Sequence, residues 1–418
     1  DPLDVIESLG ADALRFALAG MATETQDVRM PVEFQCPACG HLLEQTLHNR
    51  TKPRLDCPKC GQAFRTQWAA SEADLALPRG PAVSEKFEAG RNFSNKLWNA
   101  TRFVLMNLEG YVAGPLNAAD VIAEAPLEDR WLASRLASVS REATRAIAEY
   151  RYAELARVLY GFAWDDFCSS YLELCKARLA DPALRDRARG MLLVGLDTIL
   201  RLLHPIMPFV TEEIWQHLRE AAGDRRMPWD AADLPVTIMR ASWPEPPDAW
   251  SDQHTEEQFG IFLAVVGAIR EIRARQNVPP KTRLPAVIHT DATTADLLRP
   301  MLPAIQAMAG VDLGAVGPTA AAATGATTAS VRGCDVCVDL AELVDVEAEI
   351  TRLEKDTIKT QGFIQAKRQK LGDEKFTARA PETVVAKERA QLAELEERLA
   401  KDRAALVDLR ARQAKSPG

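Results

Sequence analysis

The sequence lacks the features that would place it in a membrane or give it a catalytic centre of its own. No run of about 18 apolar residues occurs, so no transmembrane helix and no membrane partner are expected. The six histidines are scattered and the glycines form no phosphate-cradling loop, so neither a nucleophile–base pair nor a nucleotide site is predicted. The chain begins Asp-Pro-Leu-Asp, without an initiator methionine or a signal-peptide pattern, and we therefore expect part of a longer protein.

Basic residues are also fewer than acidic ones. The sequence has 51 Lys+Arg against 59 Asp+Glu and a net charge of −8, which argues against a general nucleic-acid binder. Residues 347–418 are the exception, with 16 basic and 13 acidic residues. An acidic body with a basic arm is compatible with binding RNA through selected surfaces.

Four of the eight cysteines form a pattern that predicts metal binding. They occur as Cys36-Pro-Ala-Cys39-Gly and Cys57-Pro-Lys-Cys60-Gly, two knuckles that are each followed by a glycine. Four thiolates complete the tetrahedral shell that Zn²⁺ prefers and leave no position for water, so the predicted zinc is structural. His41 and His48 lie nearby in the sequence but are not expected to bind the metal. Without a secretory signal, this cysteine usage suits a reducing cytoplasm.

The other four cysteines give a weaker signal. Cys334 and Cys337 lie in a strand-like valine pattern without knuckle glycines, and Cys168 and Cys175 lie on a predicted helix. We interpret all four as small buried hydrophobic residues, with a second metal site as the alternative.

Periodicity predicts a mainly α chain. Asp12 is expected to cap the second of two short N-terminal helices, and Thr211 to cap a late bundle helix. Strands are expected at 284–289 and 330–340, with a low-complexity loop at 315–329 between them. The predicted domains are the end of a catalytic or stem-contact region (1–30), an inserted zinc ribbon (31–80), a helical bundle (81–250), a small α+β module (251–343) and an antiparallel coiled-coil hairpin (344–418).

The predicted hairpin depends on a heptad pattern near the C-terminus. Val385, Leu392, Leu399 and Leu406 repeat every seven residues, and a looser apolar seam runs upstream from Val346 to Leu371. Two such helices have no core of their own, so the hairpin must project from the body or lie on a partner.

The helix predicted over 85–109 carries two distinct faces. Its core face holds Phe93, Leu97, Ala100, Val104 and Leu108, and Trp98 is expected in the core as well. The adjoining stripe of Asn92, Lys96, Asn99 and Phe103 suits single-stranded RNA, because a ring stacks on a base while amides read its edges and an ammonium meets phosphate. The alternative is a solvated face with one boundary phenylalanine.

Several segments resemble valyl-tRNA synthetases. The string Gly90-Arg-Asn-Phe-Ser-Asn-Lys-Leu-Trp-Asn-Ala-Thr-Arg-Phe103 resembles the first helix of the family's anticodon-binding domain. The segments 1–16, 200–215 and 269–280 resemble the region after the KMSKS loop, the later bundle helices and the following linker. The segments 344–349 and 380–389 resemble the C-terminal coiled-coil arm.

The resemblance implies the C-terminal, tRNA-binding part of a monomeric cytoplasmic enzyme that uses ATP to attach valine to its tRNA. It places Lys96 and Phe103 at the anticodon. Asn92, Asn99 and Arg102 are further candidates for anticodon or tRNA contact. The HIGH and KMSKS motifs and the editing domain are absent, so no catalytic residue is expected here, and ATP and valine would be handled elsewhere. The ribbon interrupts the family pattern. An isoleucyl-tRNA synthetase and a non-enzymatic zinc-ribbon RNA-binding protein are the alternatives.

Overall fold

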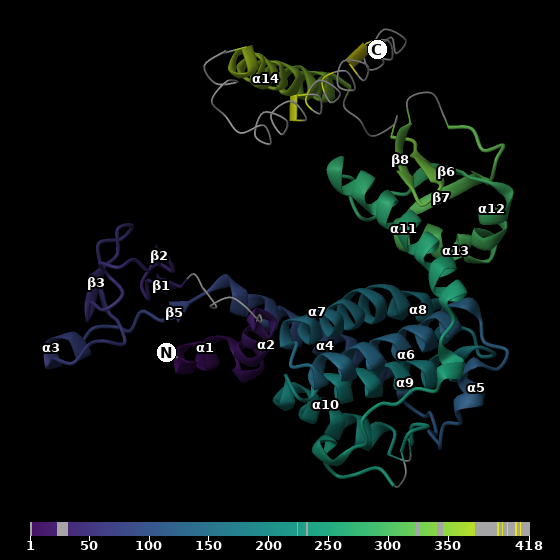
Figure 1. The fold of residues 1–418 in the computed structure, drawn as a ribbon, viewed down its shortest axis with the longest axis horizontal. Helices are drawn as coiled ribbons and strands as arrows, with labels where there is room; N and C mark the ends of the chain where they lie inside the picture. The colour runs from purple at the N-terminus through teal and green to yellow at the C-terminus, as the bar shows by residue number, and fades with distance from the viewer. Residues whose placement is uncertain are drawn as a thin grey trace. The chain divides into compact units, whose positions relative to one another are not determined.

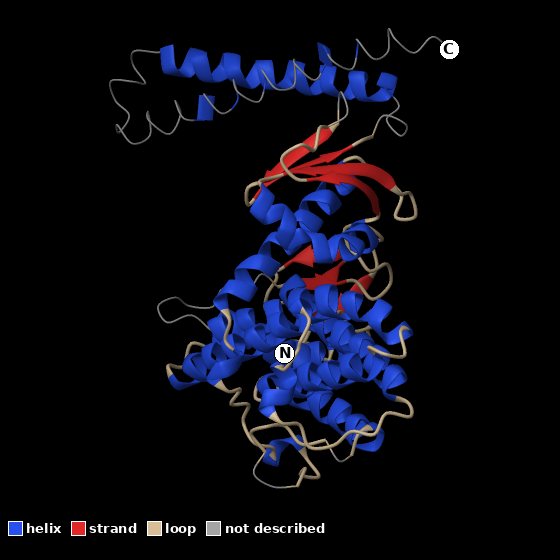
Figure 2. Ribbon diagram, turned by 90° about the vertical axis from the view of Figure 1, so that its right-hand side faces the viewer, coloured by secondary structure: helices blue, strands red, loops and turns tan. Residues whose placement is uncertain are grey.

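The computed structural model describes residues 2–22, 32–223, 225–230, 233–322, 326–340 and 346–372, together with positions 391, 392, 395, 399, 406, 407 and 410. These residues form two compact units, Asp1–Phe259 and Gly260–Gly418, which are treated separately below. Helices dominate, and strands are confined to small groups (Figure 2). No described helix is long and apolar enough to cross a membrane.

The first unit begins with α1 (Pro2–Leu9) and α2 (Ala11–Met21), as the sequence predicts. Gly10 separates them with a φ of 94°, a conformation that glycine adopts without strain. The prediction that Asp12 caps its own helix is wrong. Asp12 lies within the first turn of α2, and its carboxylate accepts hydrogen bonds from the amides of Phe209 and Val210. It therefore caps a helix that begins almost 200 residues later.

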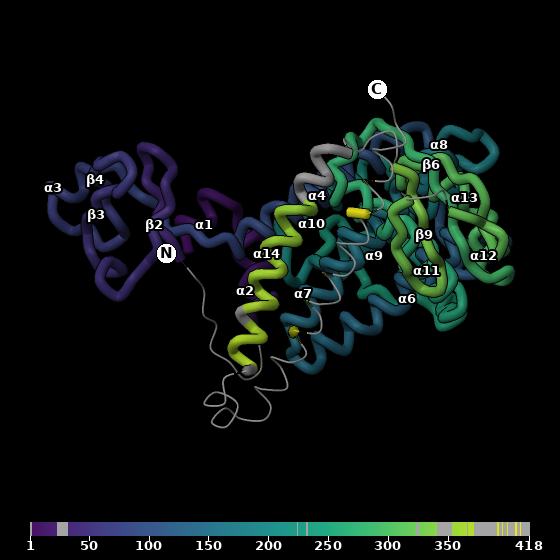
Figure 3. Tube along the Cα trace, turned by 90° about the horizontal axis from the view of Figure 1, so that it is seen from above, coloured from purple at the N-terminus to yellow at the C-terminus, as the bar shows by residue number. Residues whose placement is uncertain are grey.

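Residues 32–83 form a small two-sheet module, drawn in purple and blue in Figures 1 and 3. One sheet has the order β2-β1-β5 and the other pairs β3 with β4, all antiparallel. Phe34, Leu55 and Phe64 form its small core. The elements are β1 (Glu33–Gln35), β2 (Leu42–Glu44), β3 (Arg54–Asp56), β4 (Ala63–Arg65), α3 (Glu72–Leu75) and β5 (Ala82–Val83).

A helical bundle makes up the rest of the first unit (Figure 1). Its elements are α4 (Glu85–Leu108), α5 (Ala118–Ile122), α6 (Leu127–Ala148), α7 (Tyr152–Gly161), the π-helix η1 (Phe162–Tyr171), α8 (Leu172–Ala180), α9 (Arg185–Leu203), α10 (Pro208–Ala221) and two 3₁₀ turns, η2 (Ile238–Arg240) and η3 (Asp248–Trp250). Helix α9 is buried along nearly its whole length from Met191 onward, so it forms the centre of the bundle.

Two sequence predictions for the bundle need correction. Helix α10 begins at Pro208, and the hydroxyl of Thr211 donates back to the carbonyl of Met207 instead of capping the helix. The Trp98 side chain is 36% exposed and packs edge-on against His217, so it is not part of the core. The predicted core face of α4 is confirmed, because all five of its residues are buried.

The second unit contains a four-stranded sheet of order β7-β6-β9-β8, in which only β6 and β7 run parallel. The predicted strand at 330–340 is wrong, because a turn at Arg332 and Gly333 divides that segment between two strands of a hairpin. Cys334 and Cys337 are buried there, as predicted. The elements are the end of α11 (Gln253–Arg275), β6 (Leu284–His289), α12 (Ala292–Leu298), η4 (Arg299–Met301), α13 (Leu302–Ala309), β7 (Val311–Val316), β8 (Thr327–Val331), β9 (Cys334–Val338) and α14 (Val346–Gly372).

Candidate metal centre and nucleic-acid interface

The four predicted metal ligands come together at one point of the small module. Cys36 and Cys57 follow β1 and β3 directly and are buried, whereas Cys39 and Cys60 lie at the surface. Each knuckle closes in the same way, with the amide of Gly40 or Gly61 donating to the carbonyl of the first cysteine. Both glycines have a φ near 70°, the left-handed conformation that lets the chain turn back.

The sulfur positions match a tetrahedral metal site. All four Sγ atoms lie within 4.8 Å of one another. The Cys36–Cys60 and Cys39–Cys57 sulfur distances are 3.7 and 3.6 Å. A tetrahedron with metal–sulfur bonds of about 2.3 Å has edges of about 3.8 Å, so the four thiols can hold Zn²⁺ with little movement.

The backbone of the knuckles stabilises negative charge on sulfur unevenly. Against the desolvation that raises it, hydrogen bonds from the amides of Cys60 and Lys59 lower the pKa of the Cys57 thiol to about 7. The His41 amide lowers the pKa of the Cys39 thiol, but desolvation and the three other sulfurs raise it further, to about 12. Of these two thiols, that of Cys57 therefore ionises more readily, and a bound cation would favour the thiolate form of both.

The predicted RNA stripe on α4 lies at the surface of the bundle. Asn92, Asn99 and Arg102 are exposed, and Lys96 and Phe103 are half-buried. The structure thus leaves the functional groups of the stripe accessible from solvent, while the core face of the same helix packs into the bundle.

An aromatic cluster beside the stripe was not predicted from the sequence. The Lys96 ammonium lies 5.3 Å from the ring centroid of Trp164 on η1, and Trp164 stacks on Tyr160 at 5.3 Å with the rings 15° apart. Tyr160 in turn contacts Phe93, whose ring packs against Phe16. The spacing of Tyr160 and Trp164, four residues apart on one helix face, is the only sequence signal that could have found this pair.

The charge environment of Lys96 includes one carboxylate. Desolvation raises the pKa of Asp165, and the nearby Lys96 charge opposes that shift. Asp165 belongs to η1, a ten-residue π-helix, and π-helical turns occur frequently at functional sites. The stripe is therefore bordered by a second helix that contributes both an aromatic ring and a negative charge.

Buried ion pairs fix the helices behind this surface. Asp197 of α9 accepts from Arg201 at 2.6 Å and from Arg225 at 2.9 Å, and its side chain is fully buried. Both guanidinium groups lie over the ring of Trp215 on α10. His204, at the end of the bundle, pairs its Nδ1 with the Thr211 hydroxyl at 2.8 Å.

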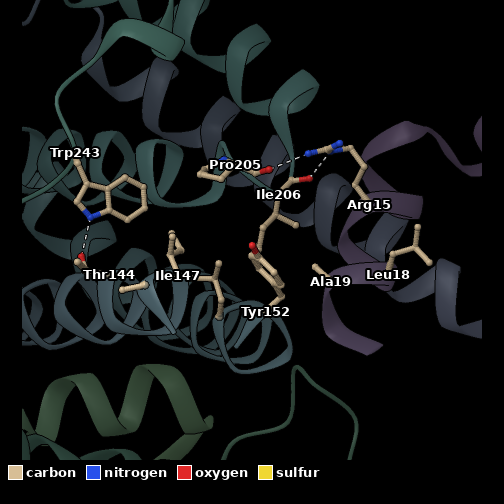
Figure 4. Close-up of a pocket in the computed structure, with 11 residues that line it drawn as sticks. Arg15, Leu18, Ala19, Thr144, Ile147, Tyr152, Pro205, Ile206 and Trp243 are labelled. Carbon is tan, nitrogen blue, oxygen red and sulfur yellow. Dashed lines mark hydrogen bonds between the residues drawn. The ribbon is translucent and has the colours of Figure 1, made fainter. Parts of the chain in front are cut away.

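A cavity of about 860 Å³ opens at one end of the bundle (Figure 4). Its lining is mostly apolar, with Leu18, Ile147 and Tyr152 among the exposed groups. Two of the polar side chains there form hydrogen bonds within the protein: Arg15 donates to the carbonyls of Pro205 and Ile206, and the Trp243 indole donates to Thr144. No carboxylate, imidazole or thiol is among the residues that line it.

Family models match two stretches of the chain. Residues 129–288 match the anticodon-binding domain of tRNA ligases, and residues 345–410 match the valyl tRNA synthetase tRNA-binding arm. The first match begins in α6, so the α4 stripe lies outside it. The second covers α14 and the segment after it.

Curated relatives match almost the whole chain. A valine–tRNA ligase of Rhodopirellula baltica is 49% identical over 96% of this chain, and one of Syntrophotalea carbinolica is 32% identical over 96%. A third, from Carboxydothermus hydrogenoformans, is 36% identical over 94%. The chain spans only 37–38% of the length of these relatives.

Proposed function

This chain belongs to the valine–tRNA ligase family, and on that premise we propose that it is the tRNA-recognising part of an enzyme that attaches valine to its tRNA. Valine and ATP would be bound by the part of the enzyme that this chain does not match. Two observations support RNA recognition as the role of the present residues: an accessible stripe of RNA-binding side chains on α4, and a basic helical segment that matches a tRNA-binding arm.

The proposed anticodon surface consists of the α4 stripe (Asn92, Lys96, Asn99, Arg102 and Phe103) together with Trp164. Phe103 is half-buried, so part of its side chain is accessible to a base. The Trp164 ring beneath Lys96 positions the ammonium, which can then meet a phosphate without losing much rotamer entropy. The side-chain amides of Asn92 and Asn99 are exposed, so they can form hydrogen bonds with base edges.

Phe103→Ala should weaken binding of a valine-anticodon stem-loop roughly five- to 150-fold, because a base stacked on an aromatic ring is worth about 1–3 kcal/mol. Lys96→Ala should cost less, and its effect should disappear at high salt, because a phosphate contact is screened. Binding is measured by titration of the labelled stem-loop, with thermal melting as the control for folding.

Trp98→Ala is the matched control for Phe103→Ala. Trp98 is an exposed aromatic residue on the same helix, but it packs against His217 and lies on the opposite side of the helix axis from Lys96 and Phe103. It should leave RNA affinity unchanged. If Phe103→Ala instead lowers the melting temperature by several degrees and binds like the parent, then Phe103 is a packing residue and the anticodon is bound elsewhere.

We also propose that residues 344–418 form an antiparallel coiled-coil hairpin. In α14, Leu353, Thr357, Thr360 and Ile364 are buried at spacings of four, three and four, which is the seam of a coiled coil. Lys367 donates to Gln391 and Arg410 to Glu354, so the later segment runs back along α14. Leu406 of the predicted heptad is buried. A turn is predicted from Gly372 to Pro381, but Gly372 still belongs to α14. The rest of that turn and Val385 lie outside the described residues.

Deleting residues 346–418 should weaken tRNA binding for cognate and non-cognate tRNAs alike and flatten its salt dependence. The reason is that the basic excess of this arm can meet only phosphates and shape, not base identity. Filter binding of valine and non-valine tRNAs over a salt series checks this. A loss confined to the valine tRNA would mean that the arm reads bases.

The Cys36, Cys39, Cys57 and Cys60 centre would hold one structural Zn²⁺, since all four positions are sulfur. All eight cysteines are free thiols, which suits a reducing cytoplasm.

We propose that the protein is a monomer and that its partner is tRNA. An isoleucine–tRNA ligase is not favoured, because the arm model that matches is the valyl one.

A further inference from the structure

We infer that the zinc module carries a second tRNA contact, in which basic side chains of residues 50–68 bind phosphates of the RNA backbone. This inference rests on the proposed tRNA binding of the chain and adds to it a surface outside both family-model matches. It gives the small module a role as an RNA-binding surface.

Charge is strongly polarised within the module. Residues 32–49 and 69–78 each hold two acidic residues and no Lys or Arg. Residues 50–68 hold one acidic residue, Asp56, and five basic ones: Arg50, Lys52, Arg54, Lys59 and Arg65. Four of these five are exposed, and Arg65 is half-buried. In a chain with a net charge of −8, this segment is a local concentration of basic side chains that an anionic partner can use.

Strand register aligns three arginines across this surface. Arg54 of β3 pairs with Arg65 of β4, and Arg65 forms a parallel bridge with Arg79. Paired residues project to the same side of a sheet, with Cβ atoms about 5 Å apart, and like charges placed opposite each other are destabilising. A row of this kind costs folding stability unless protein carboxylates or a bound anion compensate it, and a ribose–phosphate chain supplies regularly spaced anions.

Part of the row is held in place by the protein itself. The Arg65 Nε donates to the carbonyl of Leu77 at 3.0 Å, and Arg79 forms an ion pair with Asp4 of α1 at 2.6 Å. At the exposed end, Arg54 pairs with Asp56 at 3.6 Å, and both of these side chains are more than half exposed. Such an exposed pair contributes little, so Arg54 can exchange its partner for a phosphate.

An aromatic side chain accompanies the basic residues. Trp68 follows β4 by three residues, and its side chain is 51% exposed. Basic groups interleaved with an exposed ring are typical of surfaces that follow an RNA strand, because the ring packs on a base or ribose while the cations meet phosphates.

The rival explanation is that these cations only balance the thiolates of the metal centre. Lys59 lies inside the second knuckle and suits that role, so it is not used in the test. Lys52 and Arg54 precede the knuckle and are exposed, so their loss should spare the metal.

The test compares Lys52→Ala/Arg54→Ala with Arg275→Ala/Arg299→Ala, which removes two charges from exposed side chains of the other unit. Binding of whole valine tRNA to the zinc-loaded chain is measured between about 50 and 500 mM salt. The first variant should bind roughly tenfold more weakly at about 100 mM salt, and its log–log salt slope should fall by about 1.5. The control should match the parent. Zinc content is measured for every variant.

Equal affinity and slope for both variants would overturn the inference. If affinity and zinc are lost together, Lys52→Glu and Lys52→Arg decide: with zinc retained, only Lys52→Glu should lose affinity, and equal binding by these two variants would overturn the inference. Phe103→Ala is measured alongside. If it weakens binding while the module variants do not, only the module contact is wrong; if the parent does not bind tRNA, the proposed function itself fails.

Discussion

Replacing Cys36 and Cys57 together by serine should abolish zinc binding and unfold residues 32–83. These two cysteines supply half of the metal ligands, and they also belong to the small core with Phe34, Leu55 and Phe64. Such a core is too small to fold unaided, and structural zinc contributes roughly 10–16 kcal/mol to modules of this kind. The parent should contain about one zinc per chain and the variant none.

Cys334→Ser/Cys337→Ser is the matched control, because it alters the other Cys-x-x-Cys pair of the chain. Those thiols are buried in the sheet of the second unit, where Cys334 contacts Thr290 and Cys337 contacts Thr328. That variant should keep its zinc. Elemental analysis measures the metal, and limited proteolysis with mass mapping shows whether cleavage moves into residues 32–83. A Cys36→Ser/Cys57→Ser chain that retains full zinc would disprove the assignment.

Local patterns were the part of the structure that could be predicted from the sequence. The metal ligands are brought together by two short knuckles whose geometry is encoded within five residues each. The core face of α4 follows from helical periodicity alone, and Phe93, Leu97 and Val104 are buried as predicted. The positions of both short N-terminal helices also follow from Pro2 and Gly10, which act on their own neighbours.

Contacts between distant segments could not be predicted in the same way. Asp12 looked like a cap for its own helix, yet it caps α10, because only the packed bundle brings the two ends together. Trp98 looked like a core residue, but its direction on α4 points it to His217 at the surface. The Trp164 ring under Lys96 belongs to a helix more than 60 residues later. The candidate RNA surface was therefore predicted from one helix, and its second wall was missed.

Asp197→Ala should destabilise the bundle by about 3–5 kcal/mol, because removing one member of a buried ion pair leaves its partner charge uncompensated. Asp197 is the carboxylate that Arg225 contacts, and both side chains are fully buried. Arg201 would keep its contact with Asp230 at 2.5 Å, so the penalty falls mainly on Arg225. Because both guanidinium groups cover Trp215, the loss should also loosen α10 against α9.

Asp248→Ala is the comparison, since it removes a carboxylate that is fully exposed and 3.7 Å from Arg141. An exposed pair of that kind contributes about 0–1 kcal/mol. Urea unfolding followed by tryptophan fluorescence gives the free energy of unfolding for both variants, and Asp197→Asn separates loss of charge from loss of volume. If Asp197→Ala unfolds at the same urea concentration as Asp248→Ala, the bundle rearranges in the variant so that water solvates the guanidinium groups that Asp197 contacted. In that case α9 would not be the rigid centre on which the α4 surface depends.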